Sequence, residues 1–155
     1  LMIANLLQFI DFEDMRMIDL DQVYDLECRS YEFPWSRNIL KDCLLNKYDF
    51  YIASYNNKII GYVISKISTH ESHILNLTID KDYRGNGIAS ELIEMIIAKC
   101  HILGSKMIFL ETRVTNKPAK KLYEKYNFHT IGIRKGYYKT SAGREDAVVY
   151  RCLID

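Results

Sequence analysis

The sequence predicts an α/β or α+β fold, in which helices cover both faces of a mixed β-sheet, and three observations lead to this class. Segments that alternate like strands are interleaved with segments of helical periodicity, in the order strand, two helices, three strands, helix, strand, helix and two strands. The chain has 155 residues and 48% of them are hydrophobic, which is enough for a full core. Its prolines are Pro34 and Pro118, and no flexible linker divides it, so we expect one domain over residues 1–155.

The first segments predict a strand followed by two helices. Residues 12–18 are expected to form the strand. Asp21 is a suitable N-cap for a helix that runs to about Tyr31, and the sequence FPWS at residues 33–36 ends that helix. Ser36 then caps the second helix, whose apolar residues recur at helical spacing.

Three strands are expected next, at residues 49–54, 58–67 and 73–80. Asn56 and Asn57 lie between the first two of them. Because asparagine tolerates a positive φ angle, this pair fits a tight hairpin.

The second half predicts a long helix from about residue 87 to residue 103, followed by strands at 106–112, 128–134 and 146–153. The long helix is apolar on more than one side, so we expect it to pack against a sheet. Gly104 ends it, as a C-terminal glycine commonly does.

A short helix lies between the strands at 106–112 and 128–134. Asn116 or Thr115 can cap it, and Pro118 falls in its first turn, where a missing N–H is harmless. The helix should run to about Tyr126, and Asn127 follows at a position that often requires a left-handed residue.

Composition and charge argue against several classes of protein. Lys and Arg number 21 against 20 Asp and Glu, so a nucleic-acid-binding surface is not expected. No apolar run approaches the about 20 residues of a membrane-spanning helix. The four cysteines, Cys28, Cys43, Cys100 and Cys152, form no CxxC pair, which favours buried, reduced thiols over a disulfide framework or a zinc site. We expect a soluble cytoplasmic protein without a metal.

The stretch YRGNGIASEL at residues 83–92 places Gly85 and Gly87 between a strand and a helix. Such a turn presents backbone N–H groups at the positive end of a helix, which suits an anion. One interpretation is a dinucleotide-binding fingerprint, Gly85-x-Gly87-x-x-Ser90, with Glu111 as the ribose-binding acid. Ser90 at the third position and the residues 80–83 between strand and turn argue against it.

Two further interpretations of this turn were weighed. A P-loop requires GK[ST] after four intervening residues, and that sequence is absent. The third is Arg84-x-x-Gly87-x-Ala89, in which the glycines let the backbone close on a phosphate and Arg84 adds positive charge. Taken alone, this pattern also fits an ordinary helix start with permissive glycines.

With its surroundings, this pattern resembles the GNAT superfamily of N-acetyltransferases, and within it the ribosomal-protein-alanine N-acetyltransferases (RimI). The resemblance covers residues 12–153 and leaves residues 1–11 as an N-terminal extension. Its motifs are FPWS (33–36), NLTIDKDYRGNGIASELI (76–93), LETR with LYEKYNF (110–128) and IRKGYYKTSAGREDAVVY (133–150). Arg84, Thr112 and Asn127 depart from the residues that are usual in the family, and none of these changes removes a catalytic group.

The resemblance implies a mixed, mostly antiparallel sheet that is splayed in the middle, and acetyl-CoA as cosubstrate. It implies that the backbone of residues 77–79 holds the pantetheine like an added strand and that the glycine turn holds the pyrophosphate. The implied cofactor-binding residues are Leu77, Thr78, Ile79, Arg84, Gly85, Asn86, Gly87, Ile88, Ala89, Ser90 and Asn116.

The resemblance also assigns the catalytic roles, with Glu111 as general base through water and Tyr123 as the acid that protonates the leaving thiolate. By themselves, Glu111 is a strand-end carboxylate and Tyr123 an amphipathic-helix residue. A peptide α-amine has a pKa of about 7.7–8, so its deprotonation near pH 7 costs about 1.4 kcal/mol, against about 4.6 kcal/mol for lysine. An N-terminal amine therefore suits one modest base.

The acceptor groove is expected to be lined by Phe33, Trp35, Tyr137 and Tyr138, although ordinary packing also explains such aromatic residues. Acidic residues that could receive the positive charge of the substrate are Glu32 and either Glu145 or Asp146, and the latter may instead pair with Arg144.

The function that this implies is acetyl transfer to the N-terminal alanine of a small-subunit ribosomal protein, in a monomer or weak dimer. The alternatives are a GNAT enzyme for other N-termini, lysine or a small amine, a CoA-binding regulatory module, and a nucleotide-dependent oxidoreductase.

Overall fold

The computed structural model describes residues 5–155, and these residues form two compact units. Unit 1 contains residues 5–66 and 76–96, and unit 2 contains residues 67–75 and 97–155. The first residues of the predicted extension lie outside the described part, and its remainder includes a short 3-10 helix, η1 (Leu6–Phe9). That the whole chain is one domain stays a prediction.

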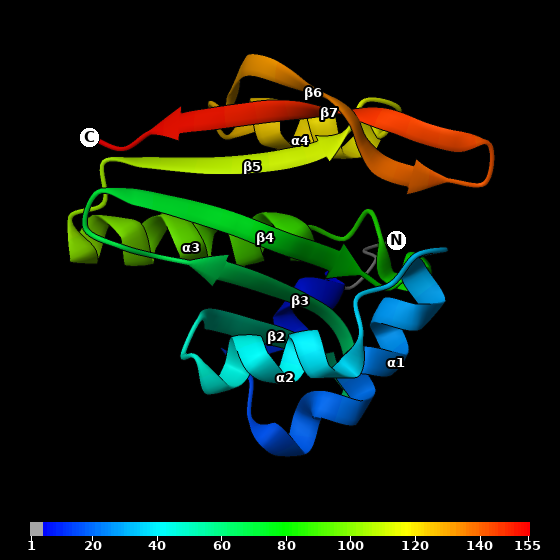
Figure 1. The fold of residues 1–155 in the computed structure, drawn as a ribbon. Coiled ribbons are helices and arrows are strands. Elements are labelled where there is room, and N and C mark those ends of the chain that lie inside the picture. The colour runs from blue at the N-terminus through cyan, green and yellow to red at the C-terminus, as the bar shows by residue number, and fades with distance from the viewer. Residues whose placement is uncertain (1–4) are drawn as a thin grey trace. The chain divides into compact units, whose positions relative to one another are not determined.

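The predicted α/β class is confirmed. The strands follow the order β1-β2-β3-β4-β5-β7-β6 in a mixed sheet (Figure 1). Strand β4 (Glu71–Ile79) and helix α3 (Ile88–Leu103) each contribute residues to both units.

Unit 1 contains an antiparallel meander with two helices. Its strands are β1 (Asp11–Asp14), β2 (Asp49–Tyr55) and β3 (Lys58–Lys66), and its helices are α1 (Leu20–Ser30) and α2 (Arg37–Leu45). Side chains at helical spacing on α1 and α2 pack on the alternating apolar side chains of β2 and β3. These core residues include Leu20, Val23, Leu26, Leu40, Phe50, Ile52, Tyr62 and Ile64.

Two local predictions in unit 1 are confirmed and one is wrong. The Ser36 side chain accepts a hydrogen bond from the Ile39 N–H at 3.1 Å and caps α2. Asn56 and Asn57 form the β2–β3 hairpin with φ angles of 49° and 63°. Asp21, in contrast, does not begin α1.

The start of α1 differs from the prediction because a buried aspartate lies two residues earlier. The predicted strand at 12–18 ends at Asp14, and a 3-10 helix, η2 (Met17–Asp19), follows it. The Asp19 carboxylate accepts a hydrogen bond from the Arg16 N–H at 2.8 Å and closes this turn, so α1 begins at Leu20.

Unit 2 contains the remaining strands and α4 (Lys117–Lys125). Strand β5 (Met107–Arg113) pairs antiparallel with β7 (Gly143–Leu153), which pairs antiparallel with β6 (His129–Thr140). Strand β5 also runs parallel to β4, and among the described residues their register covers Glu71–His73 and ends there. The sheet is therefore mixed and mostly antiparallel, as predicted, whereas its splay in the middle stays a prediction.

The β6–β7 hairpin is longer than the predicted strands at 128–134 and 146–153. Its register shifts between Arg134 and Tyr138, where Gly136 has a φ angle of +56° and donates its N–H to the Asp146 carboxylate at 2.9 Å. This bulge interrupts the alternation that marks a strand in sequence, so the hairpin continues through residues that read as a loop.

The predicted ends of the later helices are confirmed. Gly104 has a φ angle of 74° after α3, and Asn127 has a φ angle of 64° after α4. The Asn116 side-chain oxygen accepts a hydrogen bond from the Ala119 N–H at 3.2 Å and caps α4.

We expect Asn127→Ala to lower the free energy of unfolding by about 1 kcal/mol, because a residue with a Cβ is strained at a left-handed φ angle. Asn127→Gly is the matched control and should keep or raise the wild-type stability. Urea unfolding of the three proteins measures both effects. Equal stability of the alanine and glycine variants would contradict this explanation.

Candidate functional site

The glycine turn before α3 has the backbone conformation that an anion-binding loop needs. Gly85 and Gly87 have φ angles of 78° and 84°. A Cβ at Gly85 would meet no atom within 4 Å, and one at Gly87 would lie 3.7 Å from the Leu7 side chain, so glycine is required here by conformation and not by space. The turn is exposed and leads directly into the first turn of α3, which contains Ile88, Ala89 and Ser90.

Arg84 and Asn86 tie this turn to the chain before it. The Arg84 Nε donates to the carbonyl of Ile79 at 3.1 Å, and the Asn86 amide donates to the carbonyl of Tyr83 at 2.9 Å. The exposed Arg84 side chain is thus anchored beside the end of β4.

The buried carboxylate of Asp80 supports the base of the turn. It is 1% exposed, accepts hydrogen bonds from the Asp82 N–H and Arg29, and lies 3.8 Å from the Lys58 ammonium. Burial by itself would raise the pKa of this carboxyl, but the hydrogen bonds from Asp82 and Arg29 outweigh that effect, so its pKa lies below the ordinary value.

The end of β4 is closely packed in unit 1. Leu77 is half-buried, whereas Thr78 and Ile79 are buried. A Cβ on Gly61 of β3 would lie 2.9 Å from the Ile79 side chain and 3.3 Å from the Thr78 carbonyl, so glycine is needed for this approach. Gly61 was not predicted to matter, although a glycine inside a strand pattern is the signal that could have indicated it.

The aromatic residues of the FPWS segment differ in burial. Phe33 is 44% exposed, while Trp35 is half-buried and packs against the core of unit 1. The Trp35 N–H donates to the buried Glu27 carboxylate at 2.9 Å. Glu27 was missed in the sequence because it reads as one polar residue of an amphipathic helix.

In unit 2, Glu111 lies on β5 opposite Val149 of β7. Its carboxylate is 3.5 Å from the Nε of Arg134 on β6, and the Arg134 guanidinium lies 5.2 Å from the centre of the Tyr137 ring. Tyr123 on α4 is buried, and its ring packs against Phe128 and Tyr150.

A second arginine, Arg113, contacts Tyr138 and Glu145, two further residues predicted at the acceptor site. The Arg113 guanidinium lies 4.6 Å from the centre of the Tyr138 ring and donates to Glu145 at 2.7 Å. The Thr115 hydroxyl donates to the other Glu145 oxygen at 2.8 Å. The hydrogen bond from Arg113 is the main reason that the pKa of Glu145 lies below its ordinary value. The Glu145 carboxylate therefore already has a cationic partner within the protein.

The alternative ion pair between Arg144 and Asp146 is not formed. Arg144 donates to the Gly136 carbonyl at 3.4 Å, whereas Asp146 accepts the Gly136 N–H and lies 3.4 Å from the Lys135 ammonium.

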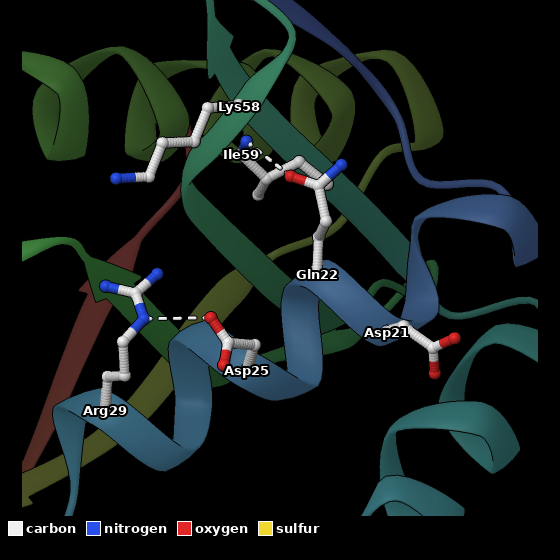
Figure 2. Close-up of a pocket in the computed structure, with 6 residues that line it drawn as sticks. All are labelled: Asp21, Gln22, Asp25, Arg29, Lys58 and Ile59. Carbon is white, nitrogen blue, oxygen red and sulfur yellow. Dashed lines mark hydrogen bonds and ion pairs between the residues drawn. The ribbon is translucent and has the colours of Figure 1, made fainter.

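A charged depression in unit 1 is separate from the predicted residues. Figure 2 shows its lining, with Arg29 facing Asp25 and Gln22 reaching the Ile59 N–H. Arg29 pairs with Asp25 at 2.9 Å and with Asp80 at 3.0 Å, and Lys58 also approaches Asp80, so its cations already have carboxylate partners.

Neither metal-ligand clusters nor cysteine thiols add another candidate site within residues 5–155. Within residues 5–155, no group of three or more His, Cys, Asp or Glu side chains could hold a metal ion. Cys43, Cys100 and Cys152 are buried as expected, whereas Cys28 is exposed because it lies on the outer face of α1. No helix in the described part of the chain is both long and apolar enough to cross a membrane.

Comparison with known proteins identifies the family to which this fold belongs. The model of the acetyltransferase (GNAT) family matches residues 20–128, which is more than half of the chain. The chain belongs to the GNAT acetyltransferase family. The glycine turn, Glu111 and Tyr123 of this GNAT chain all lie inside the matched region.

Relatives match over nearly the whole chain. The ribosomal protein bS18-alanine N-acetyltransferase of Haemophilus influenzae is 35% identical over 137 residues, which cover 88% of this chain and 93% of that protein. The crystal structure of the ribosomal-protein-S18-alanine N-acetyltransferase from Escherichia coli has a TM-score of 0.88 at 29% identity and covers 94% of both chains. A structure of the NatC complex bound to Gag peptide and CoA has a TM-score of 0.84 at 26% identity and covers 94% of this chain and 99% of that one.

We expect Asp80→Asn to lower the stability of this GNAT chain by about 2 kcal/mol at pH 7, since hydrogen bonds to charged groups contribute about 1.5–3 kcal/mol. Because the folded-state pKa of Asp80 is depressed, its stabilisation is complete above the ordinary aspartate pKa of about 4 and is lost as the pH falls through the folded-state pKa. Urea unfolding between about pH 7 and pH 3 measures the difference from wild type. It should stay constant to about pH 5 and then shrink, and a difference that grows with acidity would contradict the assignment.

Proposed function

We propose that this protein transfers the acetyl group of acetyl-CoA to the N-terminal α-amine of a protein, and that its preferred acceptor is the N-terminal alanine of a small-subunit ribosomal protein. The observation that carries this proposal is the likeness to two ribosomal-protein alanine N-acetyltransferases, which extends over nearly the whole chain. It includes the FPWS segment and the β6–β7 hairpin, where the acceptor residues are proposed.

Unit 1 supplies the proposed acetyl-CoA site. The turn at Gly85 and Gly87, the neighbouring Arg84 and the first turn of α3 fit a pyrophosphate, because they combine exposed backbone N–H groups with positive charge. The chain segment at 77–79 is proposed to run along the pantetheine. Asn116 of unit 2 is proposed to contact the cosubstrate as well, although its side-chain oxygen also caps α4.

Unit 2 supplies the proposed acid and base. Glu111 takes a proton from the acceptor ammonium through a water molecule, and the neutral amine then attacks the thioester carbonyl. Tyr123 gives a proton to the departing thiolate, which needs little help because a thiol has a pKa of about 8.5. The contact between Arg134 and Glu111 orients the Glu111 carboxylate toward β6.

The proposed acceptor contacts come from both units. Phe33 and Trp35 belong to unit 1, and Tyr137 and Tyr138 to unit 2, where arginine side chains hold both tyrosine rings. The enzyme is proposed to act in the cytoplasm as a monomer or weak dimer. Other N-termini, lysine and small amines are the competing acceptors.

Acceptor specificity provides the first test. We expect thiol release from acetyl-CoA in the presence of a short peptide that begins with Ala-Arg, and none with the same peptide acetylated at its α-amine. A lysine side chain in that blocked peptide should react at least about 100-fold more slowly, because its deprotonation costs about 3 kcal/mol more near pH 7. Equal rates for the α-amine and lysine would contradict N-terminal specificity, and release without any peptide would indicate hydrolysis.

Substitution of the proposed base tests the mechanism. We expect Glu111→Gln to lower kcat by about 10²–10⁴-fold with little change in the KM for acetyl-CoA. Part of the activity should return as the pH rises above the α-amine pKa of about 8, because the free amine then forms without a base. Tyr123→Phe should have a smaller effect.

Steady-state kinetics from about pH 6.5 to pH 9.5 measure these changes. Glu124→Gln, on the exposed face of α4, is the matched control and should behave like wild type. Wild-type kcat in the Glu111 variant would remove Glu111 from the mechanism.

A further inference from the structure

The buried carboxylate of Glu27 has no role in the chemistry proposed above, yet donors from three other segments converge on it. Glu27 lies on α1 and is 1% exposed. One of its oxygens accepts hydrogen bonds from the Tyr62 hydroxyl on β3 and from the Asn76 amide on β4, the latter at 2.9 Å. Its other oxygen accepts a hydrogen bond from the backbone N–H of Trp35 at 2.9 Å.

The network continues along β4 to the segment that follows α1. The Thr78 hydroxyl donates to the Asn76 side-chain oxygen at 2.8 Å and lies 2.6 Å from the Tyr31 hydroxyl. All these residues belong to unit 1, and Figure 1 shows the end of α1 close to the end of β4. The segment from Tyr31 to Trp35 is therefore attached at both of its ends, to Thr78 and to Glu27.

The charge of Glu27 sets the direction of the hydrogen bonds that run from Asn76 to Thr78. An ionised carboxylate accepts and cannot donate, so Asn76 presents its amide nitrogen to Glu27 and its oxygen to Thr78. The Thr78 hydroxyl uses its only hydrogen on Asn76, and it therefore accepts from the Tyr31 hydroxyl, which also donates to the Leu77 carbonyl at 3.4 Å. Burial raises the pKa of the Tyr62 phenol well above its ordinary value, and the neighbouring Glu27 charge raises it further, so this phenol also remains a donor.

We propose that Glu27 is a positioning residue that fixes the acceptor-side segment Tyr31–Trp35 against the cosubstrate-side segment Asn76–Thr78. This inference rests on the proposed function for what the two segments bind. The acceptor-side segment carries Phe33 and Trp35, and the cosubstrate-side segment carries Leu77 and Thr78. The Glu27 carboxylate is hydrogen-bonded to both segments. A displacement of about 1 Å between two reactants can lower the rate about 10²-fold. The hydrogen bonds of Glu27 should therefore affect the rate of acetyl transfer more than the affinity for either substrate.

Glu27→Gln is the sharpest change, because it keeps the size of the side chain and replaces one acceptor by a donor. The new amide nitrogen must face either the Trp35 N–H or the Asn76 amide, and both are donors. We expect kcat/KM for an Ala-Arg peptide to fall by about 10–100-fold. The CoA dissociation constant should change by less than about 3-fold, because the glycine turn is supported separately by Asp80.

A rescue variant distinguishes this network from a general loss of stability. In Glu27→Gln with Asn76→Asp, the glutamine oxygen accepts the Trp35 N–H and its amide donates to the new carboxylate, which still accepts from Thr78. The double variant should recover at least part of kcat/KM. Ser105→Ala is the control, because it removes a buried hydrogen bond to Ser72 in unit 2 and should leave the kinetics unchanged.

The chain contains one tryptophan, so its fluorescence reports the position of the Tyr31–Trp35 segment without any assay of activity. We expect Glu27→Gln to shift the Trp35 emission and to increase acrylamide quenching, and we expect the rescue variant to reverse both changes. If the wild-type protein acetylates no peptide, the proposed function fails. The fluorescence measurement still tests whether Glu27 positions the Tyr31–Trp35 segment.

Unchanged fluorescence and kinetics in a folded Glu27→Gln protein would overturn the positioning role. A fall in kcat alone that matches the fraction of unfolded protein, or no recovery in the double variant, would also overturn it. If Glu27→Gln does not fold, Tyr62→Phe is the deciding variant, because it removes one donor to Glu27 and leaves Trp35 and Asn76 in place. It should cause smaller changes in kinetics and fluorescence of the same kind. Wild-type behaviour of this variant would overturn the proposal.

Discussion

A charged carboxylate can remain buried only if donors surround it, and this requirement organises unit 1. Glu27 and Asp80 are each 1% exposed. Glu27 collects its donors from β3, β4 and the FPWS segment, whereas Asp80 collects its donors from α1 and from the turn that follows β4. These two carboxylates hold α1 and the FPWS segment against the end of β4, next to the glycine turn.

Unit 2 is organised by arginines instead of buried carboxylates. Arg113 on β5 and Arg134 on β6 flank Ala147 of β7, and each contacts one carboxylate and one tyrosine ring. These contacts are partly exposed, so their contribution to stability is small, and their effect is to orient the side chains. The bulge at Gly136 turns the tyrosine pair out of the regular strand alternation. Glu111 and Tyr137 therefore share Arg134, whereas Glu145 and Tyr138 share Arg113.

Acetyl transfer to an α-amine requires little chemical activation, and the structure is consistent with that. A peptide amine and a thioester are both reactive near neutral pH, so no covalent intermediate and no metal is needed in the proposed reaction. Most of the acceleration then has to come from placing two substrates together. Residues proposed to align the two binding segments, such as Glu27, are therefore expected to affect the rate in addition to the proposed acid and base.

The sequence by itself determined the features that depend on neighbouring residues. These include the fold class, the cap at Ser36, the Asn56–Asn57 hairpin and the left-handed positions Gly104 and Asn127, because each follows from local backbone preference and apolar periodicity. Its motifs also indicated the family, and hence Glu111, Tyr123 and the glycine turn as candidates.

The tertiary structure alone decided the features that depend on residues far apart in the chain. It placed the α1 cap at Asp19 instead of Asp21, extended the β6–β7 hairpin, engaged Glu145 with Arg113 and exposed Cys28. It also revealed Glu27, whose partners lie 8, 35 and 49 residues away. The physical reason is that burial and hydrogen-bond satisfaction are properties of the packed chain, and a single polar residue on a helix carries no local sign of them.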